Sequence, residues 1–198
     1  MAEPRGFQRG HSVSRMLKHL PNLLTGLRLA AAPALALLLF AGADRAALGV
    51  FAFAGLSDAA DGFLAKRFGF ATRFGRFLDP AADKFLMFAS FVTLSLMNIA
   101  PLWLTALVIA RDLAIVFGIL VARVLALPIR VEPLLIGKAS TAVQIVYVAL
   151  ALVLLTFGLH WTLLENIVAD MTAIVTAASW LAYAVVGARA LARRPTAA

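Results

Sequence analysis

Cysteine is absent from the 198 residues of this chain, and charged side chains are scarce. Without thiols the chain can form neither a disulfide nor a thiolate metal site, so any metal must be bound by oxygen or imidazole. Charged residues make up 14% of the sequence and hydrophobic residues 63%, far from the composition of a soluble domain. These shortages exclude a disulfide-stabilised domain and favour a protein whose solvent is mostly lipid.

Acidic residues are also few, with 10 Asp and Glu against 18 Lys and Arg and a net charge of +8. Such a balance is typical of nucleic-acid-binding proteins when the charges form a stripe on a folded surface. Here the basic residues lie between apolar runs instead. We therefore expect anionic lipid headgroups as their partners, and no nucleic acid.

Six apolar stretches are each long enough to cross the hydrocarbon core of a bilayer, which is about 30 Å thick. They cover residues 22–42, 46–66, 77–98, 102–123, 139–159 and 166–188. The sequence thus predicts an all-α integral membrane protein with six transmembrane helices. Residues 1–20 form the expected N-terminal cytoplasmic or interfacial arm or helix, residues 21–190 the six-helix domain, and residues 191–198 a cytoplasmic tail.

Basic residues gather at one end of these stretches. If the N-terminus is cytoplasmic, four basic clusters face the cytoplasm and only Arg45 faces the opposite side. The positive-inside rule therefore predicts that both termini are cytoplasmic. The Ala- and Arg-rich composition and the lack of a clear targeting segment favour a bacterial inner membrane.

Carboxylates interrupt the second and third stretches, where charged groups are costly and usually functional. They are Asp58, Asp61, Asp79 and Asp83. Because the members of each pair are three or four residues apart, each pair projects from one helix face, and two antiparallel helices can direct all four to one point near the cytoplasm. Four converging anions require cations, and oxygen ligands favour Mg²⁺ or Mn²⁺, with Ca²⁺ as a substitute. The pattern predicts a two-ion site suited to phosphoryl transfer.

The same residues lie at the spacing of a known signature. It reads D-x-x-D-G-x-x-A-R, followed eight residues later by G-x-x-x-D-x-x-x-D, and is matched by Asp58, Asp61, Gly62, Ala65, Gly75, Asp79 and Asp83. The chain therefore resembles the CDP-alcohol phosphotransferase family. One position departs from the signature, because Lys66 stands where the family has Arg, and a lysine lacks the bidentate contact that an arginine makes with phosphate. Arg67, the next residue, is the candidate to supply that contact.

The resemblance implies a six-helix, homodimeric enzyme with two metal ions and CDP-diacylglycerol as its donor. It implies that all four aspartates are metal ligands and that Asp83 is also the catalytic base. It further implies that the CDP moiety is bound by Asp61, Gly62, Ala65, Lys66, Arg67 and Gly75.

Three further segments indicate which alcohol receives the phosphatidyl group. Residues 47–64, Ala110-Arg111-Asp112 and residues 136–144 are similar to the mitochondrial type of cardiolipin synthase within the family, which implies phosphatidylglycerol as acceptor. Phosphatidylglycerophosphate synthases, which use glycerol 3-phosphate, share the aspartates and are the first alternative. An ion-coupled membrane carrier is an alternative of another class, because buried carboxylates are expected there too.

Four basic residues are candidates for binding the acceptor, three of them near the cytoplasmic ends of the predicted spans and Arg111 in the middle of one. They are Arg28, Arg73, Arg111 and Lys138. Plainer interpretations exist, since Arg28 and Lys138 suit side chains that snorkel to the interface, and Arg111 with Asp112 suits a structural ion pair. Thr141 and Gln144 suit interhelical hydrogen bonds without a catalytic part.

Overall fold

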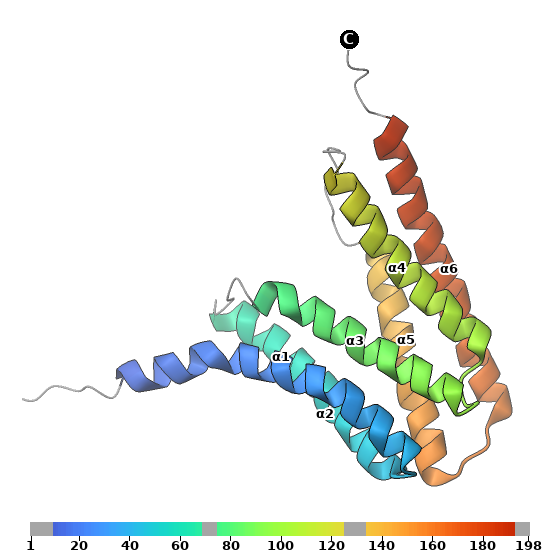
Figure 1. Cartoon of the computed structure of the whole chain (residues 1–198), viewed down its shortest axis with the longest axis horizontal. Coiled ribbons are helices and arrows are strands. Elements are labelled where there is room, and N and C mark those ends of the chain that lie inside the picture. The colour runs from blue at the N-terminus through green and yellow to red at the C-terminus, as the bar shows by residue number, and fades with distance from the viewer. Residues whose placement is uncertain (1–9, 69–74, 125–133, 193–198) are drawn as a thin grey trace, which may run out of the picture. The chain divides into compact units, whose positions relative to one another are not determined.

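The computed structural model describes residues 10–68, 75–124 and 134–192, and the regular secondary structure in these ranges is entirely helical (Figure 1). The helices are α1 Gly10–Phe40, α2 Asp44–Phe68, α3 Gly75–Leu96, α4 Leu102–Val124, α5 Leu135–Phe157 and α6 Thr162–Ala192. Side chains of residues 10–24, 59–68, 75–80 and 190–191 are outside the description. Each predicted stretch lies almost wholly on one helix, so the all-α fold class is confirmed.

Three helices are long and apolar enough to cross a membrane, as judged over the described residues. They are Leu102–Val124, Leu135–Phe157 and Thr162–Arg189, with mean hydropathies of 2.2, 2.1 and 1.6. Large apolar side chains on them point outward, such as Phe117 on α4 and Leu181 on α6, which are 67% and 68% exposed. Lipid covers such side chains at no cost, so these helices support an integral membrane protein. In α1 the apolar helix Thr25–Phe40 is shorter, and six crossings stay a prediction.

Glycine permits two of the tight connections between helices. Gly42 after α1 and Gly158 after α5 have positive φ angles of 69° and 61°. After α5 the chain closes in the usual left-handed cap, in which the Leu159 N–H donates to the Leu154 carbonyl at 2.9 Å. A side chain at either glycine would strain the backbone, so these positions allow the next helix to return antiparallel after a short link.

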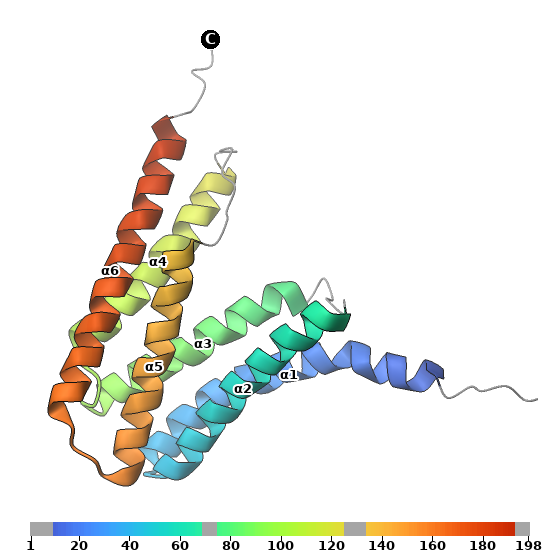
Figure 2. The same ribbon diagram turned by 180° about the vertical axis from the view of Figure 1, so that it is seen from behind.

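By contact the chain divides into two compact units, and the first is Met1–Ala89. In it α1 and α2 lie side by side (Figures 1 and 2). Its buried cluster combines Ala31 and Ala32 of α1, Ala54 of α2 and Leu86 of α3. Small side chains let helix backbones approach closely, which brings polar groups on the three helices within reach of one another.

The second unit is Ser90–Ala198, in which α6 packs against both α4 and α5 (Figure 2). Its apolar core includes Leu104 of α4 and Leu152 of α5, and the rings of Phe91 and Tyr147 stack at 5.6 Å. Polar side chains are buried here as well, and those on α5 and α6 are Ser140, Gln144, Thr172, Thr176 and Ser179. Buried polar groups between apolar helices need hydrogen-bond partners. These side chains form a polar seam between α5 and α6 that favours specific contacts.

Candidate functional site

Arg28 joins the first and last aspartates of the signature. Its Nη2 lies 3.1 Å from Oδ1 of Asp58 on α2, and its Nη1 donates to Oδ1 of Asp83 on α3 at 2.7 Å. Because Arg28 comes from α1, three helices contribute to this centre. The structure therefore brings together two of the four predicted ligands.

Burial differs sharply between the members of this centre. The Arg28 side chain is 2% exposed, whereas the carboxylates of Asp58 and Asp83 are 50% and 42% exposed. Thr25, one turn before Arg28 on α1, is also buried. The guanidinium thus sits beneath the carboxylates and leaves both of them accessible, as metal ligands and a catalytic base must be.

The remaining aspartates lie on the same two helices. Asp61 is one turn after Asp58 on α2, and Asp79 is one turn before Asp83 on α3, but their side chains are outside the description. Among the described residues no group of three or more ligating side chains is found. The four-aspartate site therefore stays a prediction, of which two members are seen to converge.

All the residues predicted to bind the CDP moiety are also in segments without described side chains. Gly62, Ala65, Lys66 and Arg67 follow Asp61 on the last turns of α2, and Gly75 begins α3. Arg73, predicted to bind the acceptor, lies outside the described residues. The helical backbone at these positions agrees with the expected ends of two neighbouring helices.

Arg111 forms a second polar centre in the second unit. Its Nη1 donates to Oδ1 of Asp112 at 2.7 Å, and its Nη2 donates to the hydroxyl of Ser179 on α6 at 2.6 Å. The guanidinium carbon lies 5.8 Å from the ring centroid of Tyr183, also on α6. The predicted ion pair between Arg111 and Asp112 is confirmed, and α6 adds a hydroxyl and an aromatic ring to it.

One donor of this centre has no acceptor. The Nε atom of Arg111 is buried and has no hydrogen-bond partner within the described part of the chain. Arg111 as a whole is 3% exposed. A buried N–H without an acceptor is destabilising, so an oxygen supplied by a ligand would be favoured at this position.

Hydrogen bonds between α5 and α6 continue the polar seam. The Gln144 amide donates to the hydroxyls of Ser140 and Thr176 at 3.2 and 3.3 Å, and these hydroxyls lie 3.2 Å apart. The interhelical bond predicted for Gln144 is confirmed. For Thr141 it is wrong, because its hydroxyl donates to the Gly137 carbonyl in its own helix, an arrangement open to any helical Thr. Lys138, predicted to bind the acceptor, is exposed.

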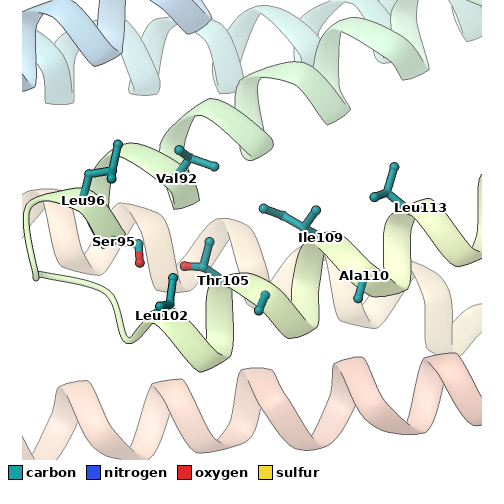
Figure 3. Close-up of a pocket in the computed structure, with 9 residues that line it drawn as sticks. Val92, Ser95, Leu96, Leu102, Thr105, Ile109, Ala110 and Leu113 are labelled. Carbon is teal, nitrogen blue, oxygen red and sulfur yellow. The ribbon is translucent and has the colours of Figure 1, made fainter.

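A cavity of about 440 Å³ opens between the end of α3 and the first half of α4 (Figure 3). Its walls are apolar apart from the hydroxyls of Ser95 and Thr105, and Thr105 donates to the Phe91 carbonyl at 3.4 Å. No charged side chain lines it. Such walls suit hydrocarbon and lack the donors that a nucleotide or phosphate requires.

Sequence reasoning missed two partners in these centres. The contacts of Arg28 with Asp58 and Asp83 were not foreseen, although an arginine inside an apolar run needs counter-ions. Ser179 was not singled out at all. Its signal is weak, because one serine in an apolar helix is common and only packing shows what it meets.

The sequence model of the CDP-alcohol phosphatidyltransferase family matches residues 18–188. This range includes every residue of both polar centres and of the aspartate signature. The match is therefore to nearly the whole chain rather than to the signature alone.

Individual relatives belong to two enzyme groups. The chain is 34% identical to human cardiolipin synthase (CMP-forming) over 180 residues, covering 83% of this chain and 60% of the human protein. It is 38% identical over 150 residues to the Streptomyces coelicolor cardiolipin synthase (CMP-forming), covering 72% and 67%. It is 37% identical over 151 residues to a probable phosphatidylglycerophosphate synthase of Mycobacterium tuberculosis H37Rv, covering 73% and 70%. The chain thus spans well under two thirds of the human relative.

Proposed function

The chain belongs to the CDP-alcohol phosphatidyltransferase family, and we propose that it is a CMP-forming cardiolipin synthase. The phosphatidyl group of CDP-diacylglycerol passes to a hydroxyl of phosphatidylglycerol, and CMP is released. The observation that carries the proposal is the convergence of Asp58 and Asp83 on Arg28, because it joins both ends of the signature at one point. The human and Streptomyces relatives support phosphatidylglycerol as the acceptor.

A second candidate is phosphatidylglycerophosphate synthase, with glycerol 3-phosphate as acceptor. It is favoured by the Mycobacterium relative, whose identity of 37% is similar to that of the cardiolipin synthases. Both reactions use the same donor and release CMP, and both acceptors carry a phosphate. The choice between them therefore rests on the acceptor pocket.

The proposed metal ligands are Asp58, Asp61, Asp79 and Asp83. The described pair fits this role, since both are part-exposed oxygen donors that share one cation, Arg28. Carboxylates suit Mg²⁺ and Mn²⁺, with Ca²⁺ as an expected substitute. When bound, two such ions polarise the donor diphosphate and stabilise the leaving phosphate.

Asp83 is the proposed general base. Its carboxylate accepts the proton of the acceptor hydroxyl, whose oxygen forms a bond to the phosphorus that carries diacylglycerol. The bond from that phosphorus to the bridging oxygen breaks, and CMP leaves with the electron pair. Arg28 holds Oδ1 of Asp83 at 2.7 Å and so orients the carboxylate toward the reacting groups.

The CDP moiety is assigned to the end of α2 and the start of α3. Its proposed contacts are Asp61, Gly62, Ala65, Lys66, Arg67 and Gly75. Residues with little or no side chain let a flat base approach the backbone, and the neighbouring cations attract phosphate. The acyl chains of the donor then enter this region from the surrounding lipid.

The acceptor is assigned to Arg28, Arg73, Arg111 and Lys138. Arg111 is a buried guanidinium whose Nε has no acceptor in the described residues, which supports its assignment. A guanidinium also matches the geometry of phosphate oxygens better than an ammonium does. We assign the phosphate of the acceptor to Arg111.

The proposal includes six membrane crossings within residues 21–190, with the N-terminal segment 1–20, the tail 191–198 and the site on the cytoplasmic side. It also includes a homodimer in a bacterial inner membrane. Support comes from the basic residues at one end of the spans and from Trp103 and Trp161 at the other, both more than half exposed. Such tryptophans are typical of the membrane interface.

An acceptor panel tests this function directly. Purified protein is given CDP-diacylglycerol with Mg²⁺ or Mn²⁺, and CMP release is measured separately with phosphatidylglycerol, glycerol 3-phosphate and, as control, phosphatidylethanolamine. CMP and cardiolipin formed with phosphatidylglycerol are the expected result. CMP released only with glycerol 3-phosphate would establish the second candidate, and no release with either would contradict both.

The ion-coupled carrier is no longer a competing interpretation of the buried carboxylates. The family match covers residues 18–188, and the relatives named above are transferases and synthases. We therefore assign the carboxylates to phosphoryl transfer.

A further inference from the structure

Two of the contacts of Arg111 come from α6. This helix contains no residue of the aspartate signature and no predicted site residue. The Ser179 hydroxyl accepts a hydrogen bond from Nη2 at 2.6 Å, and the Tyr183 ring lies 5.8 Å from the guanidinium carbon. Ser179 and Arg111 are 68 positions apart in the sequence. One helical turn separates Ser179 from Tyr183, so one face of α6 supplies both contacts.

Gly137 of α5 makes room for this arrangement. A Cβ atom at this glycine would lie 2.8 Å from Oη and 3.2 Å from Cε2 of Tyr183, and 3.4 Å from Nη2 of Arg111. The first distance is shorter than real Cβ contacts, so even alanine would displace the tyrosine ring. Gly137 of α5 thus lies close to both Tyr183 of α6 and Arg111 of α4, and its missing side chain leaves room for them.

The three donor nitrogens of Arg111 differ in their partners. Asp112 balances the charge through Nη1, and neutral Ser179 takes Nη2. Nε is left buried and without a partner in the described residues. Nε therefore needs an acceptor oxygen, and a phosphate oxygen of a bound acceptor provides one.

We propose that Ser179 and Tyr183 are positioning residues that direct Arg111 toward the phosphate of the acceptor alcohol, and that Gly137 is the small residue that admits them. The inference rests on the proposed function, in which Arg111 binds that phosphate. It extends recognition of the acceptor to α6, and it applies to phosphatidylglycerol and to glycerol 3-phosphate alike. Ser179 and Tyr183 act through Arg111 and do not touch the reacting atoms.

A purely structural role for Ser179 makes a different prediction. If its hydroxyl only held α4 against α6, its loss would lower stability and affect both substrates equally. If it positions Arg111, its loss weakens acceptor binding and leaves the donor unaffected. The KM values of the two substrates therefore separate the roles.

The test uses Ser179→Ala with the matched control Thr172→Val. Thr172 is a fully buried hydroxyl on the same helix, but it donates to the Val168 carbonyl and not to Arg111. Ser179→Ala is expected to raise the KM for the acceptor about ten-fold, as for a lost buried hydrogen bond to a charged group, with the KM for CDP-diacylglycerol unchanged. Thr172→Val should change neither KM, and Ser179→Thr, which keeps the hydroxyl, should restore the acceptor KM.

Gly137→Ala provides a second route, because it displaces Tyr183 without removing any hydrogen-bonding group. It is expected to raise the acceptor KM while donor KM stays constant. Equal changes in both KM values for Ser179→Ala and for Gly137→Ala would overturn the inference, as would no change in either.

Arg111→Gln distinguishes failure of the inference from failure of the proposed function. If Arg111→Gln raises the acceptor KM but Ser179→Ala does not, Arg111 binds the acceptor and α6 does not position it. If Arg111→Gln leaves the acceptor KM unchanged, both the acceptor assignment and the inference are wrong, while CMP release by the unaltered protein still supports the transferase. In the Arg111→Gln background Ser179→Ala should add nothing, whereas a structural role would make the effects additive.

Discussion

Among the described residues each unit buries one arginine, and the two arginines have different contacts. Arg28 contacts two carboxylates that come from other helices. Arg111 is balanced by its neighbour Asp112 and is otherwise contacted by the neutral Ser179 and the Tyr183 ring. The first centre therefore suits cations, and the second suits an oxygen that needs a hydrogen-bond donor.

The two centres also differ in the exposure of their carboxylates. The carboxylates around Arg28 are about half exposed, whereas Asp112 beside Arg111 is 19% exposed. Exposed carboxylates can exchange metal ions and protons with their surroundings, while a buried guanidinium distinguishes ligands by geometry. We therefore propose that the chemistry belongs to the carboxylates around Arg28 and that Arg111 takes part in recognising the acceptor.

Removal of metal ions should lower activity more than any single substitution. Dialysis against a chelator is expected to abolish CMP release, and Mg²⁺ or Mn²⁺ should restore it, because the carboxylates alone repel the donor diphosphate. The measurement is CMP release against added ion, with Mn²⁺ binding followed by paramagnetic resonance. Full turnover after chelation would show that the negatively charged centre holds no essential ion.

Asp83→Asn should have the next largest effect. Loss of the base is expected to lower kcat about 10²- to 10⁴-fold while the protein still inserts and folds. Asp170→Asn, an exposed position on α6, is the matched control and should be near normal. Near-normal turnover by Asp83→Asn would contradict the assignment of Asp83 as the general base.

Arg28→Met tests whether the first arginine supports the carboxylates. Its loss leaves Asp58 and Asp83 without their shared cation, and we expect stability to fall by about 1–3 kcal/mol, since both carboxylates remain partly solvated. Arg28→Lys keeps the charge but not the forked geometry, so its stability should lie between those of the unaltered protein and Arg28→Met. Thermal unfolding measures the stability, and equal Tm values for all three proteins would argue against the bridge.

Gln144→Leu should have the smallest effect. Gln144 donates to Ser140 and Thr176, which keep their contact with each other at 3.2 Å, so we expect a loss of about 1 kcal/mol or less. The KM values should be unchanged, because this part of the seam has no contact with Arg111 in the hydrogen bonds described. A raised acceptor KM in this variant would extend the second centre along α5.

Sequence patterns were sufficient for the helices and for the two carboxylates that meet in the first centre. Apolar length alone located the stretches that became α4, α5 and α6, because lipid requires helices of a given length regardless of their partners. The spacing of Asp58, Asp61, Asp79 and Asp83 was also readable, since residues three or four apart on a helix share a face. The Arg111 and Asp112 pair was readable because its members are neighbours.

Contacts between distant residues depended on the packing of the helices. Arg28 meets Asp83, 55 positions away, and Arg111 meets Ser179, 68 positions away. Neither pairing follows from periodicity, because it depends on which helices are adjacent and how each is rotated about its axis. The same holds for Gly137, whose missing side chain matters only because Tyr183 and Arg111 converge on it. Local patterns thus specified the helices and the carboxylates, while helix packing decided that Arg28 meets Asp58 and Asp83 and that Arg111 meets Ser179.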